Sequence, residues 1–208
     1  MDRPFVRVAL TGGIATGKSY CLARFAAEGA PTIDADELAR HAVAPGTAGF
    51  SQVVSRFGTS VLKSDGSLDR DALGSLVFGD PDARRALEAI VHPVVYNAIE
   101  RWFDGVGHAG HSTAAIADIP LLFDTGREGD FDIVIVAACP PEIQRARLIA
   151  RNGLTAGEAD RRISSQLPIG AKRDRADFVI DTSGTTADTD RQVREIWTTT
   201  RGGGFRRR

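Results

Sequence analysis

The feature that most constrains this chain is a glycine-rich segment near its amino terminus, Gly12-Gly13-Ile14-Ala15-Thr16-Gly17-Lys18-Ser19. The segment fits the pattern G-x-x-x-x-G-K-[ST], in which a strand ends in a tight loop that leads directly into a helix. Glycines let successive backbone N–H groups turn toward one anion, and the first turn of the helix adds further N–H groups. The segment therefore predicts a loop that binds the phosphates of a nucleotide.

The residues on either side favour this interpretation over a chance glycine-rich turn. Residues 5–10 are a short apolar run typical of a buried strand, and residues 20–26 have helical spacing. Within the loop, Lys18 supplies a cation for the outer phosphates, and the Ser19 hydroxyl is a candidate Mg²⁺ ligand. We therefore expect the loop to bind a nucleotide together with Mg²⁺.

Composition and charge exclude several other classes of protein. The 208 residues include 26 basic and 27 acidic ones, whereas nucleic-acid-binding proteins usually carry a basic excess or a concentrated basic patch. The basic cluster at 200–208 is glycine-rich, and we expect a flexible tail without a function. No apolar run approaches the roughly 20 residues of a membrane span, and the amino terminus has no signal-peptide pattern. We expect neither nucleic acid nor a membrane as a partner.

The two cysteines, Cys21 and Cys139, lie in segments that we expect to be buried, as small core residues in a reducing compartment. A cytoplasmic location is therefore the expectation. The oligomeric state stays open, with a monomer slightly favoured.

Five short apolar segments alternate with helical patterns along the chain. We expect strands at residues 5–10, 30–34, 114–118, 132–138 and 178–181. This alternation predicts an α/β fold with a five-stranded, mainly parallel sheet. Residues 48–106 have helical patterns and almost no strand, which makes them a candidate acceptor-binding insertion. Within them, Pro93 is expected to bend a long helix at 83–102, and residues 105–111 read as a glycine-rich loop.

Three aspartates stand where strands of the predicted sheet end. Asp118 closes an apolar run, so it either organises Mg²⁺ through a water or caps the following turn. Asp34 and Asp36 follow the second strand, at the edge where the phosphate loop also emerges. One of the two carboxylates could orient an acceptor hydroxyl and accept its proton, or it could simply cap the next helix.

Two further patterns leave a functional and a structural interpretation open. Arg147 and Arg151 are four residues apart on one helix, so they share a face that either stabilises a transferred phosphoryl group or is merely solvated. His92 before Pro93 either lines a pocket or is a structural histidine. The chain lacks the Asn-Lys-x-Asp motif that reads guanine, which disfavours a GTPase of the usual kind.

Further motifs give the chain a specific family resemblance. In order along the chain they are T-G-G-I-x-T-G-K-S (11–19), I-D-A-D-x-x-A-R (33–40), x-P-G (44–46), D-G-S-L-D-R (65–70), V-H-P (91–93), I-P-L-L-F-D (119–124), Arg151, Gln166 and A-D-F-V-I-D-T-S-G (176–184). Over roughly residues 6–198 the chain resembles the dephospho-CoA kinase family.

The resemblance implies ATP-dependent phosphorylation of the ribose 3′-hydroxyl of dephospho-CoA, the last step of coenzyme A biosynthesis. It also implies a single P-loop kinase domain with a three-layer fold. Its expected parts are a core (about 5–35, 112–140 and 176–198), a helical CoA-binding insert (about 36–106) and a helical lid (about 141–170).

The resemblance further implies roles for single residues. Asp36 would be the base, and Lys18, Arg147 and Arg151 would take the developing charge. The residues implied to bind ATP are Gly12, Gly13, Ile14, Ala15, Thr16, Gly17, Lys18, Ser19, Tyr20, Gln166, Asp181 and Gly184. Those implied to bind the acceptor are Asp34, Asp36, Arg40, His92, Pro93 and Leu121. Ser19 and Asp118 would bind or organise the metal ion.

Two departures from the family pattern lie outside the phosphate loop. Asp124 stands where the family commonly has glutamate, and Gly170, near Lys172, stands where many relatives have an acidic residue, so that an ion pair of the lid can be missing. We expect activity to survive both departures. The alternatives are another nucleoside or nucleotide kinase and a regulatory ATP-binding module without a small-molecule acceptor.

Overall fold

The structure, a computed structural model, describes residues 5–202 of the chain. From residue 203 onward, the basic tail lies outside the described residues. The strands are β1 (Val6–Gly12), β2 (Thr32–Asp34), β3 (Ala114–Asp118), β4 (Ile133–Ala138) and β5 (Phe178–Asp181). The helices are α1 (Lys18–Ala27), α2 (Ala35–Ala42), α3 (Ala48–Phe57), α4 (Arg70–Gly79), α5 (Pro81–Ala109), α6 (Pro141–Asn152), α7 (Ala156–Ser164), α8 (Ile169–Asp174) and α9 (Thr186–Arg201).

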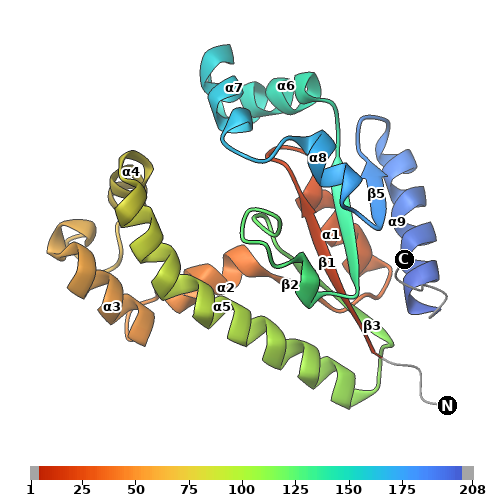
Figure 1. Ribbon diagram of the computed structural model, residues 1–208, viewed down its shortest axis with the longest axis horizontal. Coiled ribbons are helices and arrows are strands. Elements are labelled where there is room, and N and C mark those ends of the chain that lie inside the picture. The colour runs from red at the N-terminus through yellow and green to blue at the C-terminus, as the bar shows by residue number, and fades with distance from the viewer. Residues whose placement is uncertain (1–4, 203–208) are drawn as a thin grey trace. The chain divides into compact units, whose positions relative to one another are not determined.

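The five strands form one sheet in the order β2-β3-β1-β4-β5, which confirms the expected α/β sheet (Figure 1). β1 pairs in parallel with both β3 and β4, and β4 pairs in parallel with β5. In this register Leu10 is opposite Asp118, and Gly12 is opposite Ala137. The carboxyl ends of the strands therefore meet at one edge, and the phosphate-binding segment leaves from the centre of that edge.

The sheet and the helices beside it share one apolar core. Every residue of β3 and β4 is buried, as expected for parallel strands that are covered on both faces. Helices α1 and α9 pack against each other, and the buried Trp197 donates a hydrogen bond from Nε1 to the Glu28 carbonyl at 3.2 Å. Phe25 of α1 is fully buried in the same core. This packing fixes the helix that follows the phosphate loop.

Local sequence signals set where the helices begin. Capping boxes open α7, at Thr155 and Glu158, and α9, at Thr185 and Asp188. Asp69 caps α4 by accepting hydrogen bonds from the backbone of the first helical turn. These signals place polar side chains on otherwise unpaired N–H groups.

The predicted loop at 105–111 is wrong over most of its length, because α5 continues to Ala109. The last turns of α5 pack on an aromatic residue at the start of β1. The rings of Phe5 and Phe103 meet edge-to-face at 6.3 Å, and Gly107 lies close against the Phe5 ring. Packing therefore overrides the weak helix propensity of the glycines until Gly110, at φ 67°, follows the helix. The helix also runs through Pro93.

The described chain divides into two compact units, one of residues 34–102 and one of the remainder. The 34–102 unit is helical, and α2, α3, α4 and most of α5 build it. Its own apolar core includes Val43, Val53, Val61, Leu68 and Leu73. The unit thus has a core that is separate from the core of the sheet.

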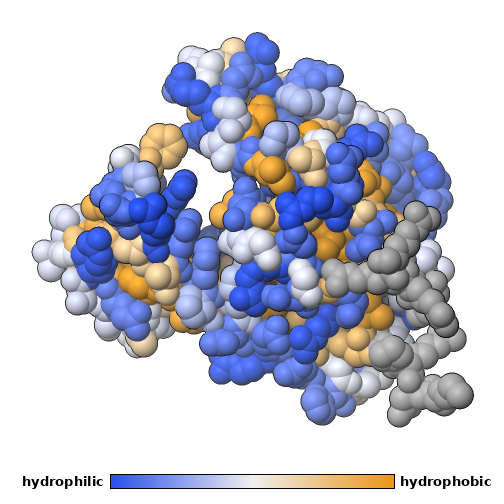
Figure 2. Space-filling view, in the orientation of Figure 1, coloured by the Kyte–Doolittle hydropathy of each residue, from blue (hydrophilic) through white to orange (hydrophobic). Residues whose placement is uncertain are grey.

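The surface carries no large apolar area on the face drawn in Figure 2, where hydrophobic residues are interspersed among hydrophilic ones. Among residues 5–202, no helix is both long enough and apolar enough to cross a bilayer.

Candidate functional site

The phosphate-binding segment joins β1 to α1 and has an unusual backbone. Gly17, the N-cap of α1, has φ 83°, and Ala15 has φ 58°. A left-handed conformation costs a non-glycine residue energy, and such strain is concentrated at functional sites. Alternating right- and left-handed residues turn successive N–H groups toward one side and so form an anion-binding concavity. The backbone of the loop thus has the form that the sequence motif predicts.

The carbonyl groups of the loop are held by side chains on its outer side. Gln144 Nε2 donates to Ile14 O at 2.7 Å, and Thr182 Oγ1 donates to Thr16 O at 2.6 Å. Within the loop, Thr16 Oγ1 donates to Gly13 O at 2.8 Å. Because a peptide unit points its N–H away from its C=O, these contacts turn the N–H groups of Ile14, Ala15 and Gly17 toward the opposite side. Thr16 N, in contrast, donates to Gly13 O at 3.3 Å within the loop.

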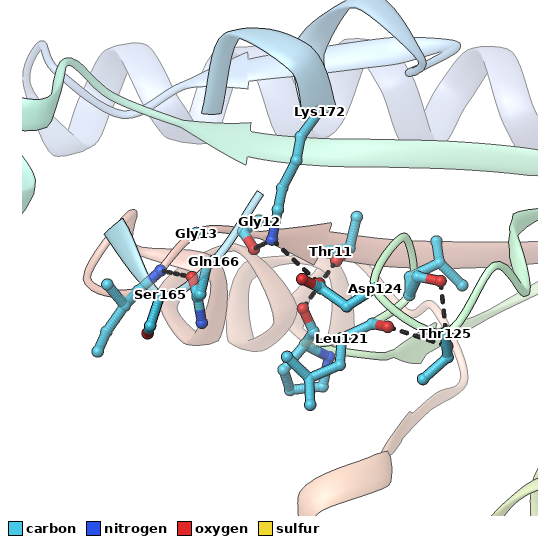
Figure 3. A network of polar contacts seen from close by, with 12 residues as sticks. Thr11, Gly12, Gly13, Leu121, Asp124, Thr125, Ser165, Gln166 and Lys172 are labelled. Atoms are coloured by element: carbon cyan, nitrogen blue, oxygen red, sulfur yellow. Dashed lines mark hydrogen bonds and ion pairs between the residues drawn. The ribbon is translucent and has the colours of Figure 1, made fainter. Parts of the chain in front are cut away.

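One N–H group of the loop is itself engaged by a side chain. Ile14 N donates to Gln166 Oε1 at 2.9 Å (Figure 3). The amide oxygen of Gln166 therefore contacts the loop where an anionic oxygen could bind.

Lys18 and Asp118 form an ion pair at the carboxyl edge of the sheet. The Asp118 side chain is 1% exposed, and the Lys18 side chain is 14% exposed. The sequence offered a metal-organising role or a turn cap for Asp118, whereas the structure makes it the counter-ion of the loop lysine. The pair keeps an ammonium group beside the anion-binding concavity.

A pocket of about 530 Å³ opens on the side of the loop that faces α6 and α9. Its walls come from the loop with α1, from α6, and from the turn after β5 with the start of α9. The lining residues are Ala15, Gly17, Tyr20, Arg147, Ala150, Arg151, Thr182, Gly184, Thr186 and Thr189. The volume suits a ligand the size of a nucleotide.

The two arginines of α6 both line this pocket, but they differ in their surroundings. Arg147 is half-buried and donates to Thr182 O at 2.6 Å and to Ala15 O at 3.4 Å. Arg151 is exposed, and its Nε donates to Asn152 Oδ1 at 3.0 Å. Arg147 thus braces the loop and the turn after β5, whereas Arg151 presents its guanidinium to solvent.

Of the other residues expected to bind ATP, some line this pocket and others lie outside its lining. Tyr20 lines the pocket and donates its hydroxyl to Asp190 Oδ1 at 2.8 Å, and this hydrogen bond raises the pKa of Tyr20. Gly184 also lines the pocket. Hydrogen bonding from the side chain of Ser183, and then from its backbone N–H at 2.8 Å, lowers the pKa of the Asp181 carboxyl. Gln166 instead contacts the phosphate loop itself, as described above.

The expected acceptor residues lie in the 34–102 unit, with the exception of Leu121. Asp34 caps α2, accepting from Asp36 N at 2.7 Å and Glu37 N at 3.3 Å. The helix-cap alternative therefore applies to Asp34, and the Asp36 side chain stands exposed in the first turn of the helix.

The remaining residues expected to bind the acceptor differ in how exposed they are. Arg40 is exposed on α2, and Pro93 is exposed on α5. His92 is half-buried, with its ring edge-to-face against Tyr96 at 6.0 Å. Leu121, in the turn after β3, is 41% exposed.

Sequence reasoning missed three residues that contact the loop. Thr182 directly follows β5 and thus lies at the edge where ligands gather, which is a signal that could have found it. Gln144 is a buried amide in α6, a helix of which only the arginines were considered from the sequence. Lys172 was considered only beside the departure at Gly170, and its full burial was not predicted. Lys172 forms an ion pair with Asp124, whose Oδ2 lies 3.6 Å from the lysine Nζ.

The donor atoms at the edge of the sheet fit a Mg²⁺ ion that accompanies a nucleotide. Within residues 5–202, no three histidine, cysteine or acidic side chains come together as a metal cluster. Mg²⁺ bound with a nucleotide usually takes one or two protein oxygens and completes its coordination with phosphates and water. The exposed Ser19 in the first turn of α1 would supply one such oxygen, and the buried carboxylate of Asp118, which pairs with Lys18, would act on the ion through a water molecule.

Comparison with known proteins points to one family. A family model described as dephospho-CoA kinase matches residues 6–188. A dephospho-CoA kinase of Anaeromyxobacter dehalogenans is 46% identical over 200 residues, covering 96% of this chain and 94% of that protein.

Solved structures agree with this result. The structure of TT1252 from Thermus thermophilus has a TM-score of 0.81 at 32% identity, covering 94% of this chain and 97% of that one. Dephospho-CoA kinase from Campylobacter jejuni has a TM-score of 0.72 at 27% identity, covering 96% of this chain and 98% of that one.

Proposed function

The chain belongs to the dephospho-CoA kinase family, and on this premise we propose that it transfers the γ-phosphoryl group of ATP to the ribose 3′-hydroxyl of dephospho-CoA. The products are CoA and ADP. The observation that carries the proposal is the phosphate loop, whose carbonyls are held outward by Gln144, Thr182 and Arg147. This arrangement prepares the N–H groups for a polyphosphate before it binds, as phosphoryl transfer requires.

ATP occupies the pocket between the loop, α6 and the turn after β5, with its phosphates in the loop. In this proposal Lys18 exchanges Asp118 for the outer phosphates, because a triphosphate offers the ammonium a stronger counter-charge than one carboxylate. Arg151, exposed on the pocket wall, takes part of the charge that develops on the phosphoryl oxygens. Arg147 serves mainly to hold Ala15 and Thr182, since its guanidinium already donates to both.

Ser19 would hold Mg²⁺ directly, and Asp118 would hold it through a water molecule. The ion would neutralise phosphate charge during the transfer. The metal and the assignment of its ligands are part of the proposal. So are the monomeric state and the cytoplasmic location expected from the sequence.

The acceptor side of the proposal rests on Asp36. Asp34 is occupied as a helix cap, so of the two carboxylates it is Asp36 that is exposed for contact with a substrate hydroxyl. Asp36 orients the 3′-hydroxyl and accepts its proton as the phosphoryl group moves. The 34–102 unit, with Arg40, His92 and Pro93, is proposed to bind the rest of the acceptor, together with Leu121.

The test measures ADP release from Mg²⁺·ATP with dephospho-CoA, adenosine or common nucleoside monophosphates as acceptors. Strong stimulation by dephospho-CoA alone is expected, whereas slow ADP release that no acceptor stimulates would contradict the proposal. Asp36→Asn should lose most turnover and keep ADP binding. The matched control is Asp71→Asn, because Asp71 is exposed two residues after Asp69, the cap of α4, just as Asp36 follows Asp34.

A further inference from the structure

Lys172 of α8 is fully buried, with 0% of its side chain exposed. Lysine is almost never buried to this extent unless it is paired, because an ammonium group loses its hydration there. Such a position is costly, and a specific interaction must offset the cost. The contacts of Lys172 show what that interaction is.

The ammonium group of Lys172 has two oxygen partners (Figure 3). Nζ donates a hydrogen bond to the carbonyl of Gly12 at 3.1 Å, and it lies 3.6 Å from Asp124 Oδ2. Burial lowers the pKa of Lys172, and the charge of Asp124 acts in the opposite direction. The partners thus divide two tasks: Asp124 balances the charge, and Gly12 receives the hydrogen bond.

Gly12 is the last residue of β1, where the chain turns into the phosphate loop. A Cβ at this position would lie 2.6 Å from Ala137 O and 2.7 Å from Thr16 Oγ1, so the backbone packs without space for a side chain. The Gly12 peptide sets the direction in which the loop leaves the sheet. A contact that fixes its carbonyl therefore fixes the first peptide of the anion-binding concavity.

Asp124 lies in a turn that also serves the other lysine of the site. This turn follows β3, and Thr125 Oγ1 closes it with hydrogen bonds to Leu121 O at 2.9 Å and Leu122 O at 3.1 Å. Six residues earlier, Asp118 pairs with Lys18. The segment from Asp118 to Asp124 thus supplies counter-ions to both lysines that contact the phosphate loop or belong to it.

We propose that Lys172 is a positioning residue for phosphoryl transfer: it fixes the Gly12 carbonyl, and with it the orientation of the phosphate loop, while Asp124 holds its ammonium group in place. Lys172 does not contact ATP in this role. It acts through the loop, so its loss weakens nucleotide binding more than acceptor binding. The inference rests on the proposed function only in that the loop binds ATP.

The first test compares Lys172→Met with Lys63→Met. Methionine keeps the length and apolar stem of lysine but removes the charge and the donors, and Lys63 is exposed in a turn of the 34–102 unit. The measurements are circular dichroism, calorimetric binding of ADP with Mg²⁺, and steady-state kinetics. Lys172→Met should bind ADP about 10- to 100-fold more weakly, the range expected for losing a hydrogen bond from a charged donor. Lys63→Met should bind ADP with wild-type affinity.

The kinetic pattern separates positioning from a purely structural role. We expect the KM for ATP to rise about tenfold or more, while the KM for dephospho-CoA changes less than threefold. A folded Lys172→Met that binds ADP with wild-type affinity, or that raises both KM values equally, would overturn the proposal. Because ADP binding needs no acceptor, this result is independent of whether dephospho-CoA is the substrate.

Variants of Asp124 decide the matter if Lys172→Met does not fold. Asp124 is 28% exposed, so Asp124→Asn removes the counter-charge with little change in packing. It should weaken ADP binding by about threefold or more, and Asp124→Glu, which keeps the carboxylate, should bind better than Asp124→Asn. Wild-type affinity in Asp124→Asn, or equal weakening by both variants, would overturn the proposal.

Discussion

The hydroxyl of Thr182 offers the most direct test of how the phosphate loop is held. Thr182 is 5% exposed, and its Oγ1 donates to Thr16 O at 2.6 Å and lies 3.3 Å from Ala138 O. Thr182→Val removes the hydroxyl while keeping a β-branched side chain of nearly the same size. The substitution therefore isolates the hydrogen bond from the packing.

The expected cost follows from which groups lose a partner. Ala138 O keeps the hydrogen bond from Thr182 N at 2.9 Å. Arg147 loses the acceptor Thr182 Oγ1, 3.2 Å from its Nη1, but it keeps its hydrogen bonds to Thr182 O and Ala15 O. Thr16 O, in contrast, loses the donor described above. Leaving a buried acceptor without its donor costs about 1–3 kcal/mol, so we expect a loss near 2 kcal/mol in the free energy of unfolding. For a chain of this length that is a fall in Tm of about 4–8 °C.

Part of this cost should appear in ligand binding, because Thr16 belongs to the loop. If the whole ~2 kcal/mol falls on the loop in its binding conformation, the Kd for ADP rises about 30-fold, and we expect a rise between about 3- and 30-fold. Urea denaturation gives the free energy of unfolding, and titration calorimetry gives the Kd. The two measurements together locate the effect.

Thr200→Val is the matched control for this prediction. Thr200 is 1% exposed, and its Oγ1 donates to Ile196 O at 2.8 Å inside α9, where that carbonyl also takes part in the helix. We expect a loss below about 1 kcal/mol and wild-type ADP binding. Thr182→Val that is as stable as the wild type and binds ADP equally well would refute the view that this hydroxyl holds the loop.

Two further predictions concern titratable groups. Glu158 closes the capping box of α7, and its hydrogen bonds with Thr155 lower its pKa below the ordinary value of 4.5. Its ionised form therefore stabilises the fold above pH 4.5, and this stabilisation is lost as the pH falls through the lowered pKa. Wild type should therefore have a higher Tm than Glu158→Gln at pH 7, and thermal melts should show the difference shrinking below pH 4.5; a difference that does not change with pH would contradict this. Burial raises the pKa of Cys21 to about 12 and also raises that of Cys139. Iodoacetamide at pH 8 should therefore modify neither thiol in the folded chain and both thiols in urea, which intact-mass measurement would show. Rapid modification of the folded chain would count against the burial of the thiols.

Much of the fold could be predicted from local patterns. The apolar segments 114–118 and 132–138 became β3 and β4, because a parallel strand that is buried on both faces must be apolar throughout. The phosphate loop was recognisable because its glycines and lysine have fixed spacing. The loop expected at 105–111 failed, because the contact of Phe103 and Gly107 with Phe5 joins residues about 100 positions apart.

The candidate site divides in the same way. The loop was predicted from the spacing of its motif and Asp118 from its place at the end of a strand, but the pairing of Asp118 with Lys18 depends on β1 and β3 being neighbours. The cap role of Asp34, rather than Asp36, depends on where α2 begins. The sequence left the cap open between the two aspartates, and it did not predict the pairing of Asp118 with Lys18.

Local patterns in the sequence were enough to predict a nucleotide-binding loop at the carboxyl edge of a mainly parallel sheet, and they indicated the family. The loop, the strands and the family motifs are patterns among residues that are close together in the sequence. The side chains that hold the loop could not be predicted in this way, because Gln144, Thr182 and Lys172 come from segments that are 130 to 166 residues away from their loop partners. A buried carbonyl needs a donor, but which residue supplies it depends on how distant segments pack.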